Sequence, residues 1–421
     1  MLAVRRLAVA GYTIPLLVMG YLVVLGYRHM PGEEVRRPPA PGVYVSEAFG
    51  PVPDRRTVET LRRTWMEERE KRRVKARGVY VSGRLAGTAK MDEIIDLIRR
   101  TELNAVVIDV KDDQGSITYD SRLPEVAEIG SRAAYIKDLD GLISCLEKEG
   151  IYSIARVVVF KDSTLAGKRP SWAVKTSGGQ VYRDRIGSAW VNPYLREVWE
   201  YNLAVAREAA SRGFREIQFD YVRFPSDGQA KGLAYEPGIE ATGGEGTSPE
   251  ETVAGGKSIV KDRIEVITGF LAYARRELEP YGVFVSADVF GLVTTAADDM
   301  GIGQRWEELA ARLDYISPML YPSHYRRMNY GLPDPDAAPY ATVYRAMQDA
   351  VRRTAGTGAI IRPWLQDFSL RHPYGPREVR AEIQAAYDAG AEEWLLWNPY
   401  SNFSEGALLP ATSKAASGGG K

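Results

Sequence analysis

A short apolar strand is predicted within Glu216-Ile-Gln-Phe-Asp-Tyr-Val-Arg-Phe-Pro225, and it runs directly into Asp220. In barrels of parallel strands, catalytic groups lie at the carboxyl ends of the strands, because the strand-to-helix loops build that rim. Arg223 follows three residues later, where its positive charge could hold the carboxylate ionised and oriented. The stretch therefore predicts a parallel α/β fold with Asp220 in its functional site.

The rest of the chain repeats this alternation of short apolar strands and amphipathic helices, which is typical of a parallel α/β fold. We expect strands at residues 78–82, 105–110, 151–160, 216–220, 282–288, 315–320, 359–365 and 393–398. Eight strand–helix units predict a closed (β/α)8 (TIM) barrel rather than an open sheet. No glycine-rich phosphate loop directly follows a strand in the sequence, which argues against a nucleotide or dinucleotide site.

The amino-terminal part of the chain differs in composition from the rest. Residues 7–27 form a charge-free apolar run that is long enough to cross a bilayer, and Arg5 and Arg6 precede it. We interpret residues 1–30 as an uncleaved signal anchor, so that a single-pass protein in the cell membrane would carry its catalytic domain outside the cytoplasm. Residues 31–76 are predicted as a proline-rich linker and a charged helix, 77–408 as the barrel and 409–421 as a disordered tail.

Composition argues against several classes of function. The 421 residues include 55 Lys and Arg against 55 Asp and Glu, and this balance gives no sign of a nucleic-acid partner. The 24 Tyr and 8 Trp can fill a core, but aromatic rings also stack on sugars. One Cys allows no intramolecular disulfide bond, and three His leave almost no material for a zinc site or a Ser-His-Asp triad.

Polar and aromatic side chains follow most of the predicted strands, and all of them should converge on one rim of the barrel. Besides the catalytic candidates Asp220 and Asp288, we expect the substrate to be bound by Asp109, Lys111, Arg156, Tyr221, Arg223, Tyr321, His324, Trp364, Trp397 and Asn398. The aromatic members would form walls that stack on sugars, and the polar members would bind hydroxyls or acidic substituents. Each residue alone could instead cap a helix, pair with a charge or fill the core.

Two of these residues fit the chemistry of glycoside hydrolysis. That reaction needs one carboxyl group that attacks or activates water and another that protonates the leaving oxygen. Asp220 and Asp288 end the fourth and fifth strands, which are neighbours, so their side chains can face one pocket. Asp220 suits the nucleophile of a retaining mechanism. Asp288 is flanked by apolar residues, and because a dry site raises a carboxyl pKa, it suits the proton donor.

Several motifs resemble the bacterial family described as "putative glycosyl hydrolase domain". They are Arg77-Gly-Val-Tyr-Val-Ser82, Asn104-Ala-Val-Val-Ile-Asp-Val-Lys-Asp112, Phe219-Asp-Tyr-Val-Arg-Phe-Pro225, Ser317-Pro-Met-Leu-Tyr-Pro322 and Trp394-Leu-Leu-Trp-Asn398. The resemblance spans about residues 77–404 and implies a barrel that acts on an extracellular or cell-surface polysaccharide. By position, Asp220 and Asp288 are also similar to the nucleophile and the acid of the α-amylase clan, although that acid is a Glu.

Two other hypotheses remain open. The barrel could bind a wall or capsule glycan without cleaving it. Alternatively, the carboxylates of Asp109, Asp112, Asp220 and Asp288 could hold Mg²⁺ or Ca²⁺ in a metal-dependent hydrolase or lyase, because these hard cations prefer oxygen ligands. The leading hypothesis, a retaining glycosidase with a carbohydrate polymer as substrate, requires neither a metal nor a cofactor.

Overall fold

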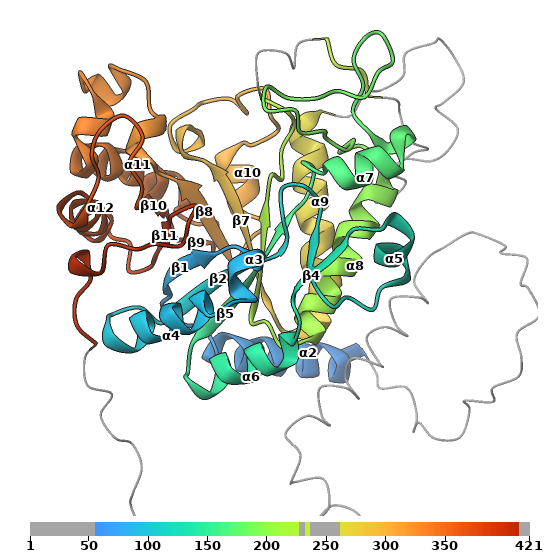
Figure 1. Cartoon of the computed structure of the whole chain (residues 1–421), viewed down its shortest axis with the longest axis horizontal. Coiled ribbons are helices and arrows are strands. Elements are labelled where there is room, and N and C mark those ends of the chain that lie inside the picture. The colour runs from blue at the N-terminus through green and yellow to red at the C-terminus, as the bar shows by residue number, and fades with distance from the viewer. Residues whose placement is uncertain (1–54, 227–231, 236–261, 412–421) are drawn as a thin grey trace, which may run out of the picture. The chain divides into compact units, whose positions relative to one another are not determined.

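The computed structural model describes residues 55–226, 232–235 and 262–411 (Figure 1). The chain divides into two compact units, one with residues up to 73 together with 279–282, and one with residues 74–278 and 283 onwards. The first unit contains α2 (Arg55–Lys71) and the 3-10 turn η3 (Glu279–Tyr281), and Arg62 donates two hydrogen bonds to Glu279. Helix α2 lies within the segment for which the sequence predicts a charged helix.

The signal anchor predicted for residues 1–30 lies outside the described residues, and so do linker residues 31–54 and tail residues 412–421. Within residues 55–226, 232–235 and 262–411, no helix is both long and apolar enough to cross a membrane. The anchor therefore stays a prediction.

The second unit contains eight parallel strands that close into a barrel (Figure 1). Each strand is hydrogen-bonded to the next, and the last strand returns to the first. They are β1 (Arg77–Val81), β2 (Ala105–Lys111), β5 (Tyr152–Val158), β6 (Glu216–Asp220), β7 (Phe284–Phe290), β8 (Tyr315–Met319), β10 (Trp364–Gln366) and β11 (Trp394–Trp397). This architecture confirms the predicted (β/α)8 barrel. The seventh predicted strand is divided, because β9 (Ile360–Ile361) pairs with β8 before β10 begins.

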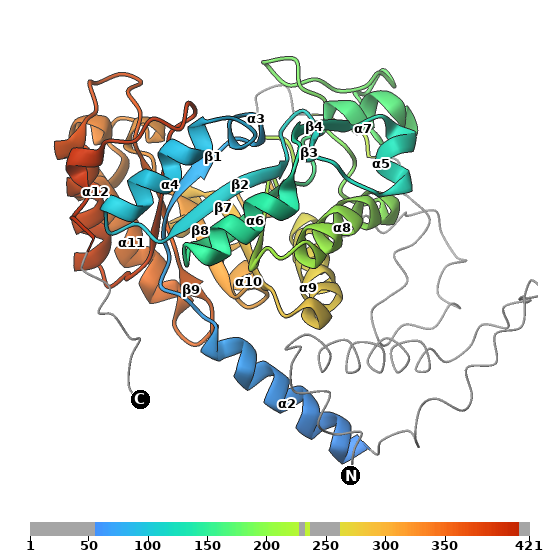
Figure 2. The same cartoon turned by 60° about the horizontal axis from the view of Figure 1, so that its bottom comes forward.

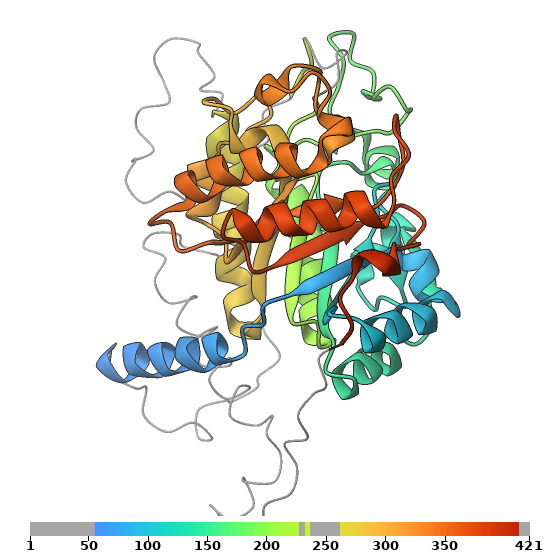
Figure 3. The same ribbon diagram turned by 90° about the vertical axis from the view of Figure 1, so that its left-hand side faces the viewer.

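Helices cover the outside of the barrel (Figures 2 and 3). They are α3 (Gly83–Ala86), α4 (Lys90–Arg100), α6 (Leu139–Lys148), α7 (Ser163–Lys168), α8 (Arg196–Ser211), α9 (Arg263–Leu278), α10 (Trp306–Ala310), α11 (Pro339–Thr354) and α12 (Pro376–Asp388). Helix α4 shows why such segments fold in this way. It buries Met91, Ile94 and Ile98 on one face, and acidic residues begin it while Arg99 and Arg100 end it, as the helix dipole favours.

Shorter elements depart from the simple repeat. After β2 the chain forms β3 (Ile117–Tyr119), α5 (Pro124–Ile129) and β4 (Arg132–Ile136), with β3 antiparallel to β2. The sequence did not predict this insertion. The 3-10 turns of the second unit are η1 (Pro170–Trp172), η4 (Gly291–Thr294), η5 (Pro322–His324), η6 (Asn329–Gly331), η7 (Pro335–Ala337) and η8 (Glu405–Ala407).

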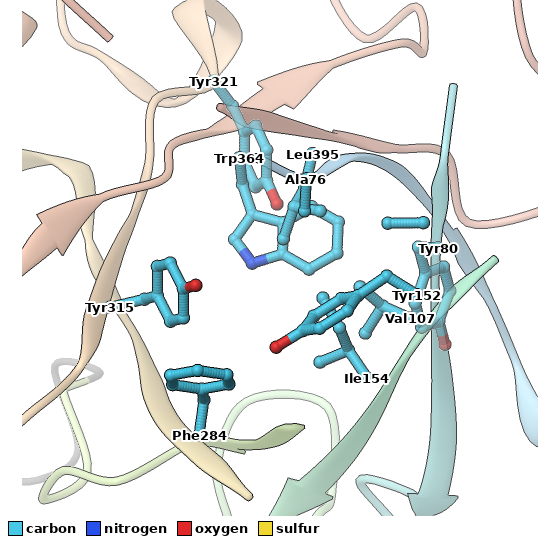
Figure 4. Packing of buried hydrophobic residues seen from close by; sticks show 11 residues of the cluster. Ala76, Tyr80, Val107, Tyr152, Ile154, Phe284, Tyr315, Tyr321, Trp364 and Leu395 are labelled. Carbon is cyan, nitrogen blue, oxygen red and sulfur yellow. The ribbon is translucent and has the colours of Figure 1, made fainter. Parts of the chain in front are cut away.

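Large side chains fill the interior of the barrel (Figure 4). Among them are Tyr152, Phe284, Tyr315 and Trp364, which point inward from different strands. The interior also holds a buried ion-pair network, in which the Arg362 guanidinium lies 2.9 Å from Glu216 and 2.8 Å from Glu393. Because the interior is packed in this way, open space for a ligand is found at the carboxyl-end rim, as is usual for this fold.

Candidate active site

Arg156 on β5 lies between three aspartates of neighbouring strands. Its Nη1 donates to Asp109 Oδ1 on β2 at 2.6 Å. Its Nε donates to Asp220 Oδ2 on β6 at 3.0 Å, and Nη2 contacts the same oxygen. Nε also lies 3.8 Å from Asp288 Oδ2 on β7. All four side chains are buried, so one guanidinium lies within 4 Å of three buried carboxyl groups.

The two candidate catalytic carboxyl groups are close to one another. The Oδ2 atoms of Asp220 and Asp288 lie 3.0 and 3.8 Å from the same Nε atom of Arg156, so these two oxygens are at most about 6.8 Å apart. Retaining glycosidases separate their carboxyl groups by about 5–5.5 Å and inverting ones by about 6.5–9.5 Å. This upper limit on the distance between the two oxygens admits the separation of a retaining pair. It admits only the shortest separations of inverting pairs.

Asp288 lies in a dry environment that favours its neutral form. Burial raises the pKa of Asp288 well above its usual range, and the nearby charge of Asp220 raises it further, while Arg156 acts in the opposite direction. Trp364 donates its Nε1–H to Asp288 Oδ1 at 2.7 Å. Because Oδ1 accepts this bond, a proton held by Asp288 belongs on Oδ2, the oxygen nearer to Arg156. Asp288 therefore has the environment of a proton donor.

Asp220 is held at both of its oxygens. Oδ2 accepts from Arg156, and Oδ1 accepts from the backbone N–H of Tyr221 at 2.5 Å. Tyr221 has a φ of 48°, in the left-handed region that aromatic residues rarely adopt. Such strain is often found at functional sites, where the surrounding structure enforces it. The turn after β6 therefore orients the Asp220 carboxylate with little freedom.

Asp109 holds Arg156 in place and does not line the cavity. Its Oδ2 accepts a hydrogen bond of 2.5 Å from the Tyr80 hydroxyl, and its Oδ1 accepts from Arg156. The Tyr80 ring in turn stacks on Trp397 with ring centroids 4.0 Å apart. Burial, opposed by Arg156, raises the pKa of Asp109. The sequence predicted substrate contact for Asp109, but the structure makes it a support for Arg156.

A cavity of about 520 Å³ opens above these carboxyl groups, a size typical of small-ligand sites. It is lined by Arg156, Asp220, Tyr221, Arg223, Asp288, Phe290, Gly291, Leu292, Met300, Met319, Tyr321, His324, Tyr325, Arg326 and Trp397. Of the side chains that the sequence singled out, the structure thus brings together Asp220, Asp288, Arg156, Tyr221, Arg223, Tyr321, His324 and Trp397. Asp109, Lys111, Trp364 and Asn398 do not line the cavity.

Lys111 was expected to bind substrate, but it points away from the cavity. Its side chain is 0% exposed, and Nζ lies 2.7 Å from both Asp162 Oδ2 and the Val158 carbonyl oxygen. Nζ also lies 5.7 Å from the ring centroid of Tyr201 on α8, outside the barrel. The physical reason is an irregularity in the β2–β5 register between Asp109 and Lys111, which breaks the alternation that would place both on one face. Lys111 is therefore part of a structural ion pair.

Trp364 and Asn398 also have supporting roles in place of the predicted contact with sugar. Trp364 is buried beneath the cavity, where its indole N–H holds Asp288 and its ring packs edge-on against Trp397. Asn398 donates to the Asp367 carbonyl oxygen and accepts from the backbone of Tyr400, so it stabilises the loop after β11.

Arg223 lines the cavity, but the contacts expected of it are made by Arg156. The Arg223 Nη1 donates to the Phe224 carbonyl oxygen at 3.0 Å and to Ser226 Oγ at 3.2 Å. The hydrogen-bonded ion pair with Asp220 comes from Arg156, which is 64 residues earlier in the sequence. Proximity along the chain suggested Arg223, whereas the pairing of β5 with β6 brings Arg156 to the carboxylate.

Several lining residues were missed. Phe290, Leu292 and Arg326 lie in segments that directly follow predicted strands, so a systematic reading of every strand end could have found them. Met300 lies further along the connection after β7, and no signal in the sequence distinguishes it.

The carboxylates proposed for a metal site are occupied by the chain's own donors. Asp109 and Asp220 are bound to Arg156, and Asp112 Oδ1 accepts from the backbone N–H groups of Gln114 and Ser116. In the part of the chain that the structure describes, no group of three or more His, Cys, Asp or Glu side chains is arranged to hold a metal ion. The arrangement gives no support to the metal-dependent hypothesis.

Residues 78–403 match the family described as "Putative glycosyl hydrolase domain". The chain belongs to this family. The match covers nearly the whole barrel, including both candidate catalytic aspartates, and confirms the resemblance inferred from the strand-end motifs.

Solved structures are similar to the barrel. A hypothetical protein from Ruminiclostridium thermocellum is 36% identical, with 50% of this chain and 97% of that chain covered and a TM-score of 0.42. The glycoside hydrolase domain of PgaB (BpsB) from Bordetella bronchiseptica is 15% identical, with 78% and 95% covered and a TM-score of 0.55. At this identity the second likeness shows the fold alone. No curated protein matches the chain.

Proposed function

We propose that the protein is a retaining glycoside hydrolase of an extracellular or cell-surface polysaccharide, with Asp220 as nucleophile and Asp288 as acid/base. One observation carries this proposal. Two carboxyl groups on neighbouring strands face one cavity and differ in their contacts, since Asp220 is hydrogen-bonded to a guanidinium whereas Asp288 accepts from an indole and has a pKa raised by burial. When two carboxyl groups in one site have environments that favour different protonation states, the group that favours the neutral form is the acid and the other is the nucleophile. Membership of a family described as a glycosyl hydrolase supports the same reaction class.

The reaction would proceed in two displacements. An oxygen of the Asp220 carboxylate forms a bond to the anomeric carbon, the glycosidic C–O bond breaks, and the proton of Asp288 Oδ2 goes to the leaving oxygen. Water then attacks the same carbon, Asp288 takes a proton from this water, and the bond to Asp220 breaks. The two displacements restore the anomeric configuration, the carboxylate and the protonated acid.

The test is a hydrolysis screen of the full-length chain on a glycan panel, with Asp220→Asn and Asp288→Asn. On an unactivated glycan both variants should lose at least about 10³-fold in kcat/KM, because each removes a group of the two-step mechanism. On an aryl glycoside whose leaving group needs no proton, Asp288→Asn should keep far more activity than Asp220→Asn. Proton NMR of the first product should show the configuration of the substrate.

Asp92→Asn is the matched control, because Asp92 is an exposed carboxylate on α4, outside the cavity lining. Equal product release by wild type and Asp220→Asn would refute the proposal. Glycan binding without turnover by any of the four proteins would favour the alternative of a non-catalytic glycan-binding barrel.

We also propose that residues 1–30 anchor the protein in the cell membrane, with the barrel outside the cytoplasm. The charge-free run of residues 7–27 supports this. Two reporters fused after residue 411 test this proposal, one that is active only outside the cytoplasm and one that is active only inside it. The first fusion should be active and the second inactive. Activity of the cytoplasmic reporter alone would overturn the proposal.

A further inference from the structure

Arg223 differs from the other buried arginines in what surrounds it. Among the described residues, the arginines Arg69, Arg156, Arg223 and Arg362 are buried. Arg69, Arg156 and Arg362 each have a carboxylate oxygen within 4.0 Å. Arg223 is only 7% exposed, yet no carboxylate of the described residues forms an ion pair with it. Since a buried charge without a counter-ion is unfavourable, its retention in a cavity wall points to a ligand.

Aromatic rings hold the Arg223 guanidinium without neutralising it. Its Cζ lies 4.3 Å from the ring centroid of Phe290, 4.9 Å from that of Trp190 and 5.1 Å from that of Tyr221. These rings stabilise a cation through their faces but offer no acceptor to its N–H groups. Burial lowers the pKa of Arg223, and the charges of Tyr221, Asp220 and Asp184 only partly oppose this. The rings thus position the guanidinium, while the described carboxylates that act on its charge do so from beyond ion-pair distance.

One edge of the guanidinium remains available. Nη1 donates to the Phe224 carbonyl oxygen and to Ser226 Oγ. Within the described part of the chain, Nε and Nη2 make no hydrogen bond, and Arg223 lines the cavity. These two N–H groups form the edge of an arginine that binds two oxygens of one carboxylate or phosphate.

A second cation lines the same cavity. Arg326 is exposed, and its side chain has no ion pair with any described carboxylate. His324, beside it, adds little charge, because desolvation and then the charge of Arg371 lower its pKa. Arg156 also lines the cavity, but Asp109 and Asp220 already offset its charge. Among the described residues that line the cavity, Arg223 and Arg326 are therefore the arginines without a carboxylate within ion-pair distance.

We propose that the cavity binds a glycan carrying an oxyanion substituent, and that the Nε and Nη2 groups of Arg223 receive this anion while Arg326 attracts it at the rim. The substituent is a uronic carboxylate or a phosphate ester, since both present two oxygens at the spacing of the guanidinium edge. This inference names the substrate class of the proposed glycosidase site and rests on that proposal for the cleavage step. The binding step does not depend on it.

The experiment compares binding of paired polymers to the full-length chain by affinity electrophoresis. Polygalacturonate, hyaluronan and alginate are each paired with their carboxyl-reduced forms, and phosphomannan is paired with its dephosphorylated form. Wild type should bind at least one anionic polymer about tenfold or more tightly than its neutral partner, as expected for loss of a charge-assisted hydrogen bond. The pair that shows the preference identifies carboxylate or phosphate as the group.

Substitutions assign the preference to Arg223. Arg223→Gln should reduce the ratio of the affinities for the anionic polymer and its neutral partner to about one. Arg223→Lys keeps the charge but lacks the two N–H groups that bind a pair of oxygens, so it should give an intermediate ratio. Arg377→Gln is the control, because Arg377 is 94% exposed outside the cavity and should keep the wild-type ratio. If Arg223→Gln does not fold, two other measurements test the proposal. Arg223→Lys should lower the preference for the anionic polymer, and free galacturonate or inorganic phosphate should compete with that polymer for the wild type.

Binding and cleavage are read separately, so the two proposals can fail independently. Preference for an anionic polymer that depends on Arg223, with no product released, leaves this inference standing and refutes the hydrolase. Cleavage of neutral glycans alone, with equal rates for wild type and Arg223→Gln, overturns this inference and leaves the hydrolase. Absence of binding to every anionic polymer in the panel also overturns it.

Discussion

Removal of the Arg156 guanidinium by Arg156→Met is expected to destabilise the barrel in a pH-dependent manner. The substitution keeps an unbranched chain of similar shape but leaves Asp109 and Asp220 without their charged donor. Removing one partner of a buried ion pair costs about 3–5 kcal/mol. We expect a loss of this size in the free energy of unfolding at pH 7.

The same structure limits the size of the loss. A stranded carboxyl group can take up a proton, so its penalty cannot exceed the free energy of protonating it. For Asp109, with an ordinary pKa of 3.8, this limit is about 4 kcal/mol at pH 7 and about 1.6 kcal/mol at pH 5. The destabilisation by Arg156→Met should therefore decrease by about 1–3 kcal/mol between pH 7 and pH 5.

The directions of the pKa shifts determine whether the destabilisation by Arg156→Met grows or shrinks as the pH rises. Burial already raises the pKa of Asp109 and Asp288 in the folded protein, and Arg156 opposes both shifts. The substitution therefore raises these folded-state pKa values further. A carboxyl group with a raised pKa contributes stability at low pH and loses it as the pH rises through the folded-state value. The difference between Arg156→Met and wild type must then grow with pH.

Urea unfolding of the full-length chain, followed by tryptophan fluorescence at pH 5 and pH 7, measures both quantities. Adding Asp109→Asn and Asp220→Asn to Arg156→Met should recover much of the loss at pH 7, because no charge is then stranded. A loss below about 1 kcal/mol at pH 7, or an equal loss at both pH values, would show that Arg156 is not the counter-ion we describe.

Three further substitutions test supporting contacts. Trp364→Phe removes the indole N–H bond that lowers the pKa of Asp288, so the high-pH limb of kcat/KM should move to higher pH; a move to lower pH contradicts the assignment of Asp288 as acid. Lys111→Met breaks the buried pair with Asp162 and should lower stability by about 3–5 kcal/mol while leaving KM unchanged; a raised KM with unchanged thermal stability would restore a substrate role. Gly291→Ala places a Cβ 2.3 Å from a carbonyl oxygen of β8, so kcat/KM should fall several-fold; an unchanged kcat/KM would mean that this cavity wall does not contact substrate.

Gly167→Ala on α7 is the matched control for the glycine substitution. A Cβ added at Gly167 would meet no atom within 4 Å, and alanine is the better helix former by about 1 kcal/mol. Activity should be unchanged and stability equal or higher.

The strands of the barrel could be predicted because each is a short apolar run followed by polar residues. β2 (Ala105–Lys111) begins with four apolar residues and is buried along its whole length, as such a run in a parallel sheet indicates. β6 (Glu216–Asp220) is equally buried, although its apolar residues Ile217 and Phe219 alternate with polar ones. The position of Asp220 at a strand end then follows from the fold. The insertion of β3, α5 and β4 could not be predicted in the same way, because β3 has only three residues and is defined by its pairing with β2.

The partners of the site residues were less predictable than their positions. A register irregularity after Asp109 turns Lys111 out of the barrel, and no local pattern in the sequence marks it. Trp364 was expected at a sugar-binding wall, but its depth in the barrel interior depends on the packing of several strands. Arg223 was assigned to Asp220 because it is three residues away, although the neighbouring strand provides the nearer cation.

The place of Arg156 between the two carboxyl groups has a consequence for the proposed reaction. Before the first displacement, the negative charge is on Asp220, 3.0 Å from the Arg156 Nε, and Asp288 is neutral. After it, the Asp220 oxygen is esterified and Asp288, 3.8 Å from the same nitrogen, carries the charge. The net charge around Arg156 is unchanged, so one fixed guanidinium can serve as counter-ion in both states without reorganisation of the site. Arg223, three residues from Asp220, is then left free to recognise the substrate.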